Sequence, residues 1–243
     1  MRFDEHLDAL VAGCRTTEGV TSLTTFGSTA ASEAGRRDEW SDLDFCVFFR
    51  PDRSDELRAS WAFLPWREHV VLEAREYENG GVVIYDDGTL YEFGAGTPWP
   101  FSDPHRDVVI DGGDLTLADP PTLPDPAQSV RLFLAKLYIG MGRLRRGERV
   151  AANAHIRCHA LGGLAEALRQ RLAPDAPRSP FDPFRRIEQA LPGPASRIAE
   201  ALDADMEACA RALFDLSREL LEPGWDAYPS RAADVVADRL GWR

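Results

Sequence analysis

The sequence has few cysteines and no long apolar run. Its 243 residues contain four widely spaced cysteines and no Cys-x-x-Cys pair, which argues against a disulfide framework or a zinc site and indicates free thiols in a reducing compartment. No segment approaches about eighteen uninterrupted apolar residues. The opening Met-Arg-Phe-Asp-Glu also lacks the apolar stretch of a signal peptide. From these absences we expect a cytoplasmic protein without a membrane partner.

Basic residues are scarce in the first half of the chain. Residues 1–120 contain 24 acidic side chains and 10 arginines, a net charge of −14, whereas residues 121–243 carry a net charge of +2. Nucleic acids are bound mainly by neutralising their phosphates, so an acidic half without a basic stripe argues against a nucleic-acid partner. The acids would instead attract a small cation, or they serve only solubility.

Two closely spaced acids beside an apolar strand are the most informative pattern. Residues 21–26 and 43–49 each predict a strand, and Asp42 and Asp44 stand at the start of the second. Because side chains alternate along a strand, carboxylates two residues apart project from one face. Mg²⁺ is usually held by a few carboxylates together with substrate phosphates. We therefore expect a magnesium site with a nucleoside triphosphate as its further ligand.

A tight turn after the first predicted strand supplies the other half of this site. Gly27 has no Cβ, which allows the backbone to approach a polyphosphate closely. Ser28, at the start of a predicted helix, can offer its hydroxyl and amide groups to phosphate oxygens.

A third acid follows a hairpin signal. Asp87-Gly88 predicts the turn between strands near residues 81–85 and 89–94, which places Glu92 on the second of these strands. This strand could lie beside the one that carries Asp44. Asp86 and Asp87 are explained by turn chemistry. Glu92 is either a catalytic acid or a solvated residue on an exposed sheet face.

These motifs resemble the signature of the polymerase-beta-like nucleotidyltransferase superfamily. The shared features are a hydrophobic-Gly-Ser turn, an Asp-x-Asp pair and a third acid in a hydrophobic triplet, here Tyr91-Glu92-Phe93. The spacing over residues 23–94 looks more narrowly like that of lincosamide nucleotidyltransferases and their aminoglycoside-modifying relatives. The resemblance implies transfer of a nucleoside monophosphate, commonly AMP from ATP, to an antibiotic hydroxyl with release of pyrophosphate. Relatives are often dimers, so a homodimer is also implied.

The chain is predicted to have an α+β fold in two domains. Residues 1–120 are expected to form a mixed sheet with helices at 3–17 and 53–64 and an additional strand at 69–77. The proline-rich segment 120–126 is the predicted linker. Residues 121–243 are expected to form a helical bundle that contributes to nucleotide and acceptor binding. Its predicted helices cover 127–146, 148–172, 183–191, 195–221 and 230–240, with Ser230 as the cap of the last one.

Lys136 is notable because it is the one lysine beside 27 arginines. A compact, rotatable charge suits phosphate oxygens, and in similar proteins a lysine of the helical domain often contacts the triphosphate. The alternative is a surface residue whose stem packs on apolar neighbours. His155 and His159, four residues apart on a predicted helix, could bind a transition metal, but no third ligand accompanies them. Trp99, in the loop after Glu92, could line an acceptor pocket.

The expected chemistry is attack of an acceptor hydroxyl on the α-phosphorus. Two Mg²⁺ ions held by Asp42, Asp44 and Glu92 would activate the hydroxyl and screen the leaving pyrophosphate. Glu92 is the candidate general base. The alternatives are a protein-modifying, AMPylating transferase of the toxin-antitoxin type and a nucleotide-binding regulator without turnover.

Overall fold

The computed structural model describes residues 3–102, 106–116, 118–119, 121–177, 179 and 182–243. The chain divides into two compact units, Met1–Pro120 and Pro121–Arg243. This division falls in the proline-rich segment, whose first residue, Pro120, lies outside the described residues. The roles that the sequence suggests for the two units remain predictions.

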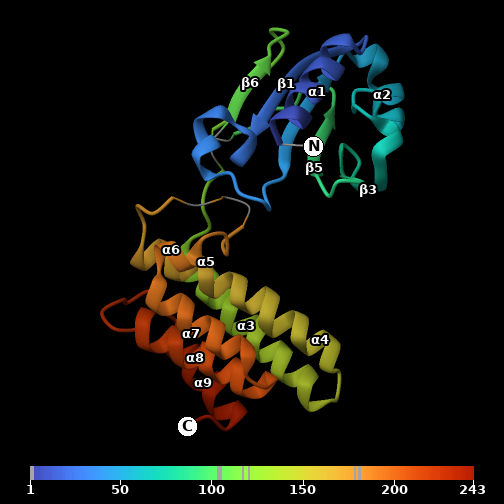
Figure 1. Cartoon of the computed structure of the whole chain (residues 1–243). Coiled ribbons are helices and arrows are strands. Elements are labelled where there is room, and N and C mark those ends of the chain that lie inside the picture. The colour runs from blue at the N-terminus through green and yellow to red at the C-terminus, as the bar shows by residue number, and fades with distance from the viewer. Residues whose placement is uncertain (1–2, 103–105, 117, 120, 178, 180–181) are drawn as a thin grey trace. The chain divides into compact units, whose positions relative to one another are not determined.

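The N-terminal unit contains a mixed sheet of six strands (Figure 1). The strand order is β3-β4-β5-β2-β1-β6, and all neighbouring strands are antiparallel except β2 and β5. The elements are α1 Phe3–Thr16, β1 Val20–Phe26, β2 Leu43–Phe49, α2 Ser54–Ser60, β3 Val70–Tyr77, β4 Gly80–Tyr85, β5 Leu90–Gly96 and β6 Arg106–Ile110.

One face of this sheet packs against apolar residues of α1, of α2 and of the segment that follows α2. The core rings are close together: Phe45 of β2 stacks on Phe93 of β5 with centroids 5.1 Å apart, and Phe63 meets Phe93 edge-on. Alternate residues of β2 and β5 therefore point into this core, and the residues between them point to the opposite face. The core includes Leu10, Cys14, Leu23, Leu43, Phe45, Val47, Leu57, Trp61, Phe63, Tyr91 and Phe93.

Three expectations for the N-terminal unit are wrong. Strand β6 lies within residues 94–126, where the many Gly, Pro and Asp residues predict only irregular chain, and it pairs with β1. Helix α2 ends at Ser60, because Trp61 takes a left-handed conformation with φ 48°. Ser28 does not open an α-helix; it lies in a three-residue 3₁₀ turn, Gly27–Thr29, which a second 3₁₀ segment follows.

The C-terminal unit is helical throughout its regular elements (Figure 1). Residues 149–172 run through three helical segments without a break, the middle one a π-helix, η5. A buried apolar cluster that includes Phe133, Ile156, Leu164 and Leu213 joins the helices. The elements are α3 Pro126–Arg145, α4 Arg149–Asn153, η5 Ala154–Ala160, α5 Leu161–Leu172, α6 Ile187–Ala190, α7 Pro192–Asp203, α8 Met206–Leu221 and α9 Ser230–Leu240.

The helical predictions need three corrections. The single helix expected at 195–221 is two helices, because Ala204 is extended and the Asp205 carboxylate accepts from the amides of Glu207 and Ala208 at the start of α8. Segment 183–191 holds only the short helix α6. Ser230 does not cap α9, whose first flanking residue is Pro229. In the described parts of the chain, no helix combines the length and the apolar character needed to cross a membrane.

Substitution of Gly81 by Ala is expected to destabilise the N-terminal unit. A Cβ at this position of β4 would overlap the Trp61 ring and lie 2.7 Å from the Ala74 carbonyl oxygen of β3. Overpacking of this kind costs about 1–3 kcal/mol. Urea unfolding should show this loss for Gly81→Ala and a change within about 0.5 kcal/mol for Gly35→Ala, where a Cβ meets nothing within 4 Å. Equal stability of the two variants would contradict the packing described.

Candidate metal centre

The parallel pairing of β2 with β5 brings three acidic residues together. In this register Asp44 lies directly opposite Glu92, with Leu43 opposite Tyr91 and Phe45 opposite Phe93. Asp42 immediately precedes β2. The three side chains each place a carboxylate oxygen so that all three oxygens lie within 4.8 Å of one another. Asp42 and Asp44 are half-buried and Glu92 is exposed, so this acidic triad is accessible from solvent.

The turn after β1 supports the triad through hydroxyl groups. Thr29 Oγ1 donates to the Asp42 carbonyl oxygen at 3.2 Å and accepts from the Asp44 amide at 2.8 Å. Ser28 Oγ lies 3.5 Å from the same Asp42 carbonyl oxygen. The Thr29 side chain is almost fully buried. A single hydroxyl thus fixes the backbone on both sides of Leu43 and holds the chain at the point from which both aspartates project.

Arg37 also stabilises this turn, through hydrogen bonds to two of its carbonyl oxygens. Arg37 donates from Nε to the Ser28 carbonyl oxygen at 2.7 Å and from Nη2 to the Thr29 carbonyl oxygen at 3.2 Å. Its third nitrogen donates to the Asp4 carboxylate at 2.9 Å, and its guanidinium lies over the Phe3 ring. Neither Thr29 nor Arg37 was identified from the sequence. Thr29 could have been found from the sequence, because it carries a hydroxyl two residues after Gly27. The contacts of Arg37 could not, because they form only in the folded chain.

The triad lies at one end of the sheet face that is turned away from the aromatic core. Across the strands, Asp44 is opposite Glu92, Glu92 opposite Val82, and Val82 opposite Ala74, so these four residues share that face. The neighbouring part of the face is covered. There Trp99 packs on Phe48 at 4.8 Å between ring centroids and lies close to Gly94 and Gly96.

The electrostatic environment of this face is acidic. The negative charge on Glu76 raises the pKa of Tyr77. A hydrogen bond with Glu76, burial, and the charge on Glu92 act in the same direction. Burial raises the pKa of the Cys46 thiol to about 12, and Asp44 contributes in the same direction. Such a field favours a bound cation.

The other predicted site residues lie in different places. Gly27 and Ser28 are on the turn beside the triad, and Gly27 has a φ of 52°, a backbone conformation that favours glycine. Lys136 belongs to the C-terminal unit, where it is half-buried on α3. Contact of Lys136 with a triphosphate therefore remains a prediction.

The secondary candidates show different environments. His155 and His159 are neighbours with ring centroids 5.4 Å apart, and among the described residues no group of three or more metal-ligating side chains includes them. Near these histidines in the sequence, Glu148 is paired with Arg146 and Arg143. Asp87 is more than a turn residue, because its carboxylate lies 3.0 Å from Nε2 of buried His6 and thereby connects α1 to the β4–β5 hairpin.

No protein-family model matches the chain, and no curated protein matches it either.

Loss of the Thr29 hydroxyl is expected to weaken both the fold and the metal site. Thr29→Val keeps the branched shape but removes the acceptor for the Asp44 amide and the donor to the Asp42 carbonyl. We expect a loss of about 1–3 kcal/mol in unfolding free energy and weaker Mn²⁺ binding in calorimetry. Thr29→Ser, which retains the hydroxyl, is the control. Unchanged Mn²⁺ affinity in a folded Thr29→Val protein would show that the hydroxyl does not organise the triad.

The four thiols are expected to differ sharply in reactivity. Burial raises the pKa values of Cys14 and Cys46 to about 12, and burial also raises the pKa of Cys209, so these groups remain protonated at pH 8. Cys158 is exposed. A chromogenic disulfide reagent should label one thiol rapidly in the native protein and the other three only after denaturation, since the thiolate is the reacting form. Rapid labelling of Cys158→Ser would contradict this assignment.

Proposed function

We propose that this protein is a Mg²⁺-dependent nucleotidyltransferase that transfers a nucleoside monophosphate, AMP from ATP, to a hydroxyl of a small-molecule antibiotic and releases pyrophosphate. The observation that carries the proposal is the convergence of Asp42, Asp44 and Glu92 within 4.8 Å. A cluster of acidic side chains also occurs without a metal. Here, however, the cluster stands beside a glycine turn and belongs to a motif that resembles a nucleotidyltransferase signature.

The donor set fits a hard dication. Three carboxylates offer only oxygen ligands, which Mg²⁺ prefers, and they leave coordination positions for substrate phosphates. When bound, Mg²⁺ would supply charge neutralisation at the phosphates and acidify the acceptor hydroxyl. Asp42 and Asp44 would hold the metal, and Glu92 would be its third protein ligand.

The side chains around the metal ligands have separate tasks in this proposal. Glu92 is the most exposed of the three acids and would accept the proton of the acceptor hydroxyl. The Gly27–Ser28 turn would hold the nucleotide phosphates through backbone amides and the Ser28 hydroxyl. Thr29, fixed to Asp42 and Asp44, would keep these groups in register with the turn. Positioning of this kind is a large part of the catalysis of phosphoryl transfer.

The acceptor would occupy the sheet face next to Glu92. Val82 and Ala74 continue the row of Asp44 and Glu92 across the sheet, and Leu72 and Tyr77 of β3 are exposed. Apolar groups beside carboxylates suit a hydroxylated molecule that also has an apolar part, as lincosamides do. The acidic field suits an aminoglycoside. Both classes therefore belong in the test.

Pyrophosphate release from ATP and Mg²⁺, measured with the full-length protein across aminoglycosides and lincosamides, tests the proposal. We expect release with at least one acceptor. Asp42→Asn, Asp44→Asn and Glu92→Gln should each reduce turnover by at least about a hundredfold, because each removes a metal ligand or the proton acceptor.

Asp86→Asn is the matched control. Asp86 is an acid of the same hairpin that pairs with His69, outside the triad, and its replacement should leave turnover near the wild-type value. If no acceptor yields pyrophosphate, or if the folded triad variants turn over normally, the proposed reaction is wrong. Transfer of label from α-labelled ATP to a protein instead of a small molecule would favour the AMPylating alternative.

A further inference from the structure

A cavity opens in the N-terminal unit on the face of the sheet that carries the aromatic core. It lies between α1, the strands β1 and β6, and the turn after β1, and its volume is about 330 Å³. Thr25 of β1 is opposite Phe45, whose ring belongs to the core, so the cavity and the acidic triad lie on opposite faces of the sheet. Small-molecule sites have volumes of about 300–1,000 Å³, and this cavity falls within that range.

A buried hydroxyl group lines this α1–β6 cavity without a hydrogen-bond partner. Thr25 is only 1% exposed, and its Oγ1 makes no hydrogen bond within the described residues. Buried hydroxyl groups normally have a partner. The Thr25 hydroxyl therefore indicates that the cavity takes a ligand with a hydrogen-bonding group.

Two carboxylates accompany this hydroxyl. Asp107 of β6 is paired with Thr25 across the strands, so their Cβ atoms are about 5 Å apart on the same face. Asp107 accepts from the Ala31 amide, which leaves most of its lone pairs available. Asp8 of α1 also lines the cavity, is exposed, and has no ion-pair partner in the described chain. These three side chains offer oxygen acceptors to the three N–H donors of one primary ammonium group.

An arginine lines the other end of the cavity. Arg15 follows Asp8 by seven residues, which places it two turns, about 10 Å, further along the same side of α1. The Asp4 carboxylate holds the start of α1 at the turn after β1, so Arg15 lies away from this turn. Arg15 is exposed, and no carboxylate of the described residues pairs with it. Val11 of α1 lies between the two charges, and Val109 of β6 adds a second apolar group to the cavity wall.

Other classes of ligand fit this arrangement less well. An anion would be repelled by Asp8 and Asp107. A metal ion would need a third ligand, and among the residues that the structure describes, no group of three metal-ligating side chains includes either acid. A wholly apolar molecule would leave the Thr25 hydroxyl unpaired. The order of the groups instead matches a molecule with an ammonium group at one end, a carboxylate at the other and methylene groups between them.

We infer that the α1–β6 cavity binds a small ω-amino acid. The ammonium group of this ligand donates to Thr25, Asp107 and Asp8, and its carboxylate pairs with Arg15. Its methylene chain packs on the two valines. Charge-assisted hydrogen bonds at both ends supply the specificity. The inference is independent of the proposed nucleotidyl transfer and of the acidic triad.

The cavity shares one wall with the candidate metal centre. Thr29 and Ala31, from the turn and the segment after it, both line the cavity. The Thr29 hydroxyl also fixes the backbone at Asp42 and Asp44. A ligand in the cavity therefore contacts this turn without contacting the acids on the other face, so its binding can be measured with the acids removed.

Calorimetric titration of the full-length protein with 6-aminohexanoate tests the site. We expect saturable binding, and we expect hexanoate, which lacks the ammonium group, to bind at least about tenfold more weakly. Thr25→Val keeps the branched shape but removes the hydroxyl, and it should lower the affinity for 6-aminohexanoate by about tenfold. Thr25→Ser retains the hydroxyl and should bind like the wild type. Asp8→Asn, which removes an exposed carboxylate, should lower the affinity by about fivefold.

Replacement of Arg15 distinguishes the two ends of the cavity. Arg15→Gln should lower the affinity for 6-aminohexanoate by about three- to fivefold. The same variant should change the affinity for hexylamine, which has no carboxylate, by less than about twofold. For the same reason, the wild-type protein should bind hexylamine more weakly than 6-aminohexanoate.

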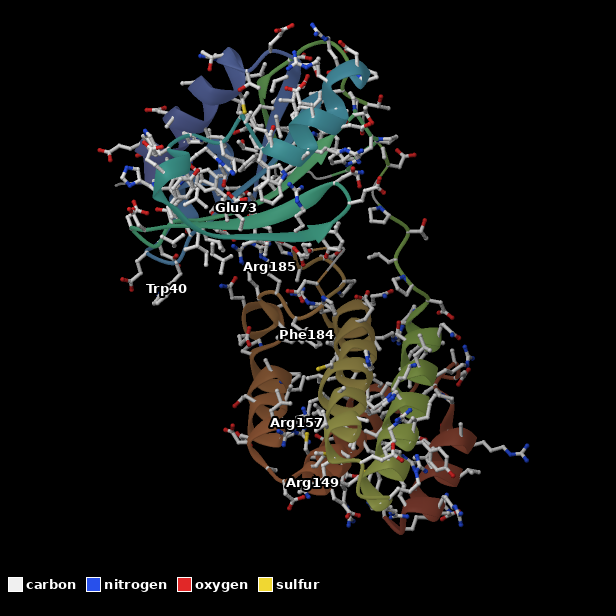
Figure 2. The ribbon with its side chains drawn as sticks, turned by 90° about the vertical axis from the view of Figure 1, so that its right-hand side faces the viewer. Trp40, Glu73, Arg149, Arg157, Phe184 and Arg185 are labelled. Atoms are coloured by element: carbon white, nitrogen blue, oxygen red, sulfur yellow. The ribbon has the colours of Figure 1, made fainter. Side chains whose placement is uncertain are left out.

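Two controls separate this site from general attraction and from the metal centre. Glu73 lies on β3 (Figure 2), at the edge of the sheet opposite to β6 and five strand spacings, about 24 Å, from it. Glu73→Gln therefore removes an acid of the same unit far from the cavity and should change the affinity by less than about twofold. The triple variant Asp42→Asn, Asp44→Asn and Glu92→Gln should bind 6-aminohexanoate like the wild type while losing Mn²⁺. This result would stand even if no nucleotidyl transfer were found.

Four results would overturn the inference, with circular dichroism used to establish that each variant is folded. The first is that 6-aminohexanoate does not bind at millimolar concentration, and the second is that folded Thr25→Val and Asp8→Asn proteins bind it as the wild type does. The third is that Glu73→Gln weakens binding as much as these variants do. The fourth is that Arg15→Gln weakens hexylamine binding as much as 6-aminohexanoate binding.

Discussion

The parallel pairing of β2 and β5 is the constraint on which the candidate metal centre depends. This pairing sets Asp44 opposite Glu92 and, with the same register, sends Phe45 and Phe93 into the aromatic core. A shift of one residue would turn all side chains of a strand to the other face. The acids can therefore meet only while the rings on the opposite side remain packed, so core packing and site geometry are one structural property.

The turn after β1 adds a second, local constraint. Thr29 connects this turn to the start of β2 through hydrogen bonds to backbone atoms. Arg37 donates to two carbonyl oxygens of the turn and, through the Asp4 carboxylate, connects the turn to α1. The hydrogen bonds that Thr29 makes are to backbone atoms of Asp42 and Asp44, so they depend on the path of the backbone, which the pairing with β5 fixes. The pairing of β2 with β5 and the hydrogen-bonded turn after β1 thus fix the positions of the three acids. They keep these like charges close together despite their repulsion.

The sequence predicts those features that depend on local patterns. The Asp-Gly turn, the apolar strand after Asp42 and the long helix that contains Lys136 follow from residue order, and the structure has them. Strand β6 was missed because its five residues stand among residues typical of loops, and its pairing with β1 is a long-range contact. The split between α7 and α8 was missed although Asp205 is a good helix cap. The contacts of Arg37 could not be predicted, because they join segments whose proximity arises only in the folded chain.

The side chains of strand β3 affect whether another chain can pair with the edge of the sheet. It forms one edge of the described sheet, and all of its residues after Val70 are exposed. An exposed edge of eight residues is a template on which another chain can add a strand. Charged side chains along β3 oppose this: Glu73 is held by Arg67 at 2.6 Å, and Arg75 lies over the Trp61 ring. Any chain that added itself there would have to desolvate these charges, so the edge is protected against self-association by its own electrostatics.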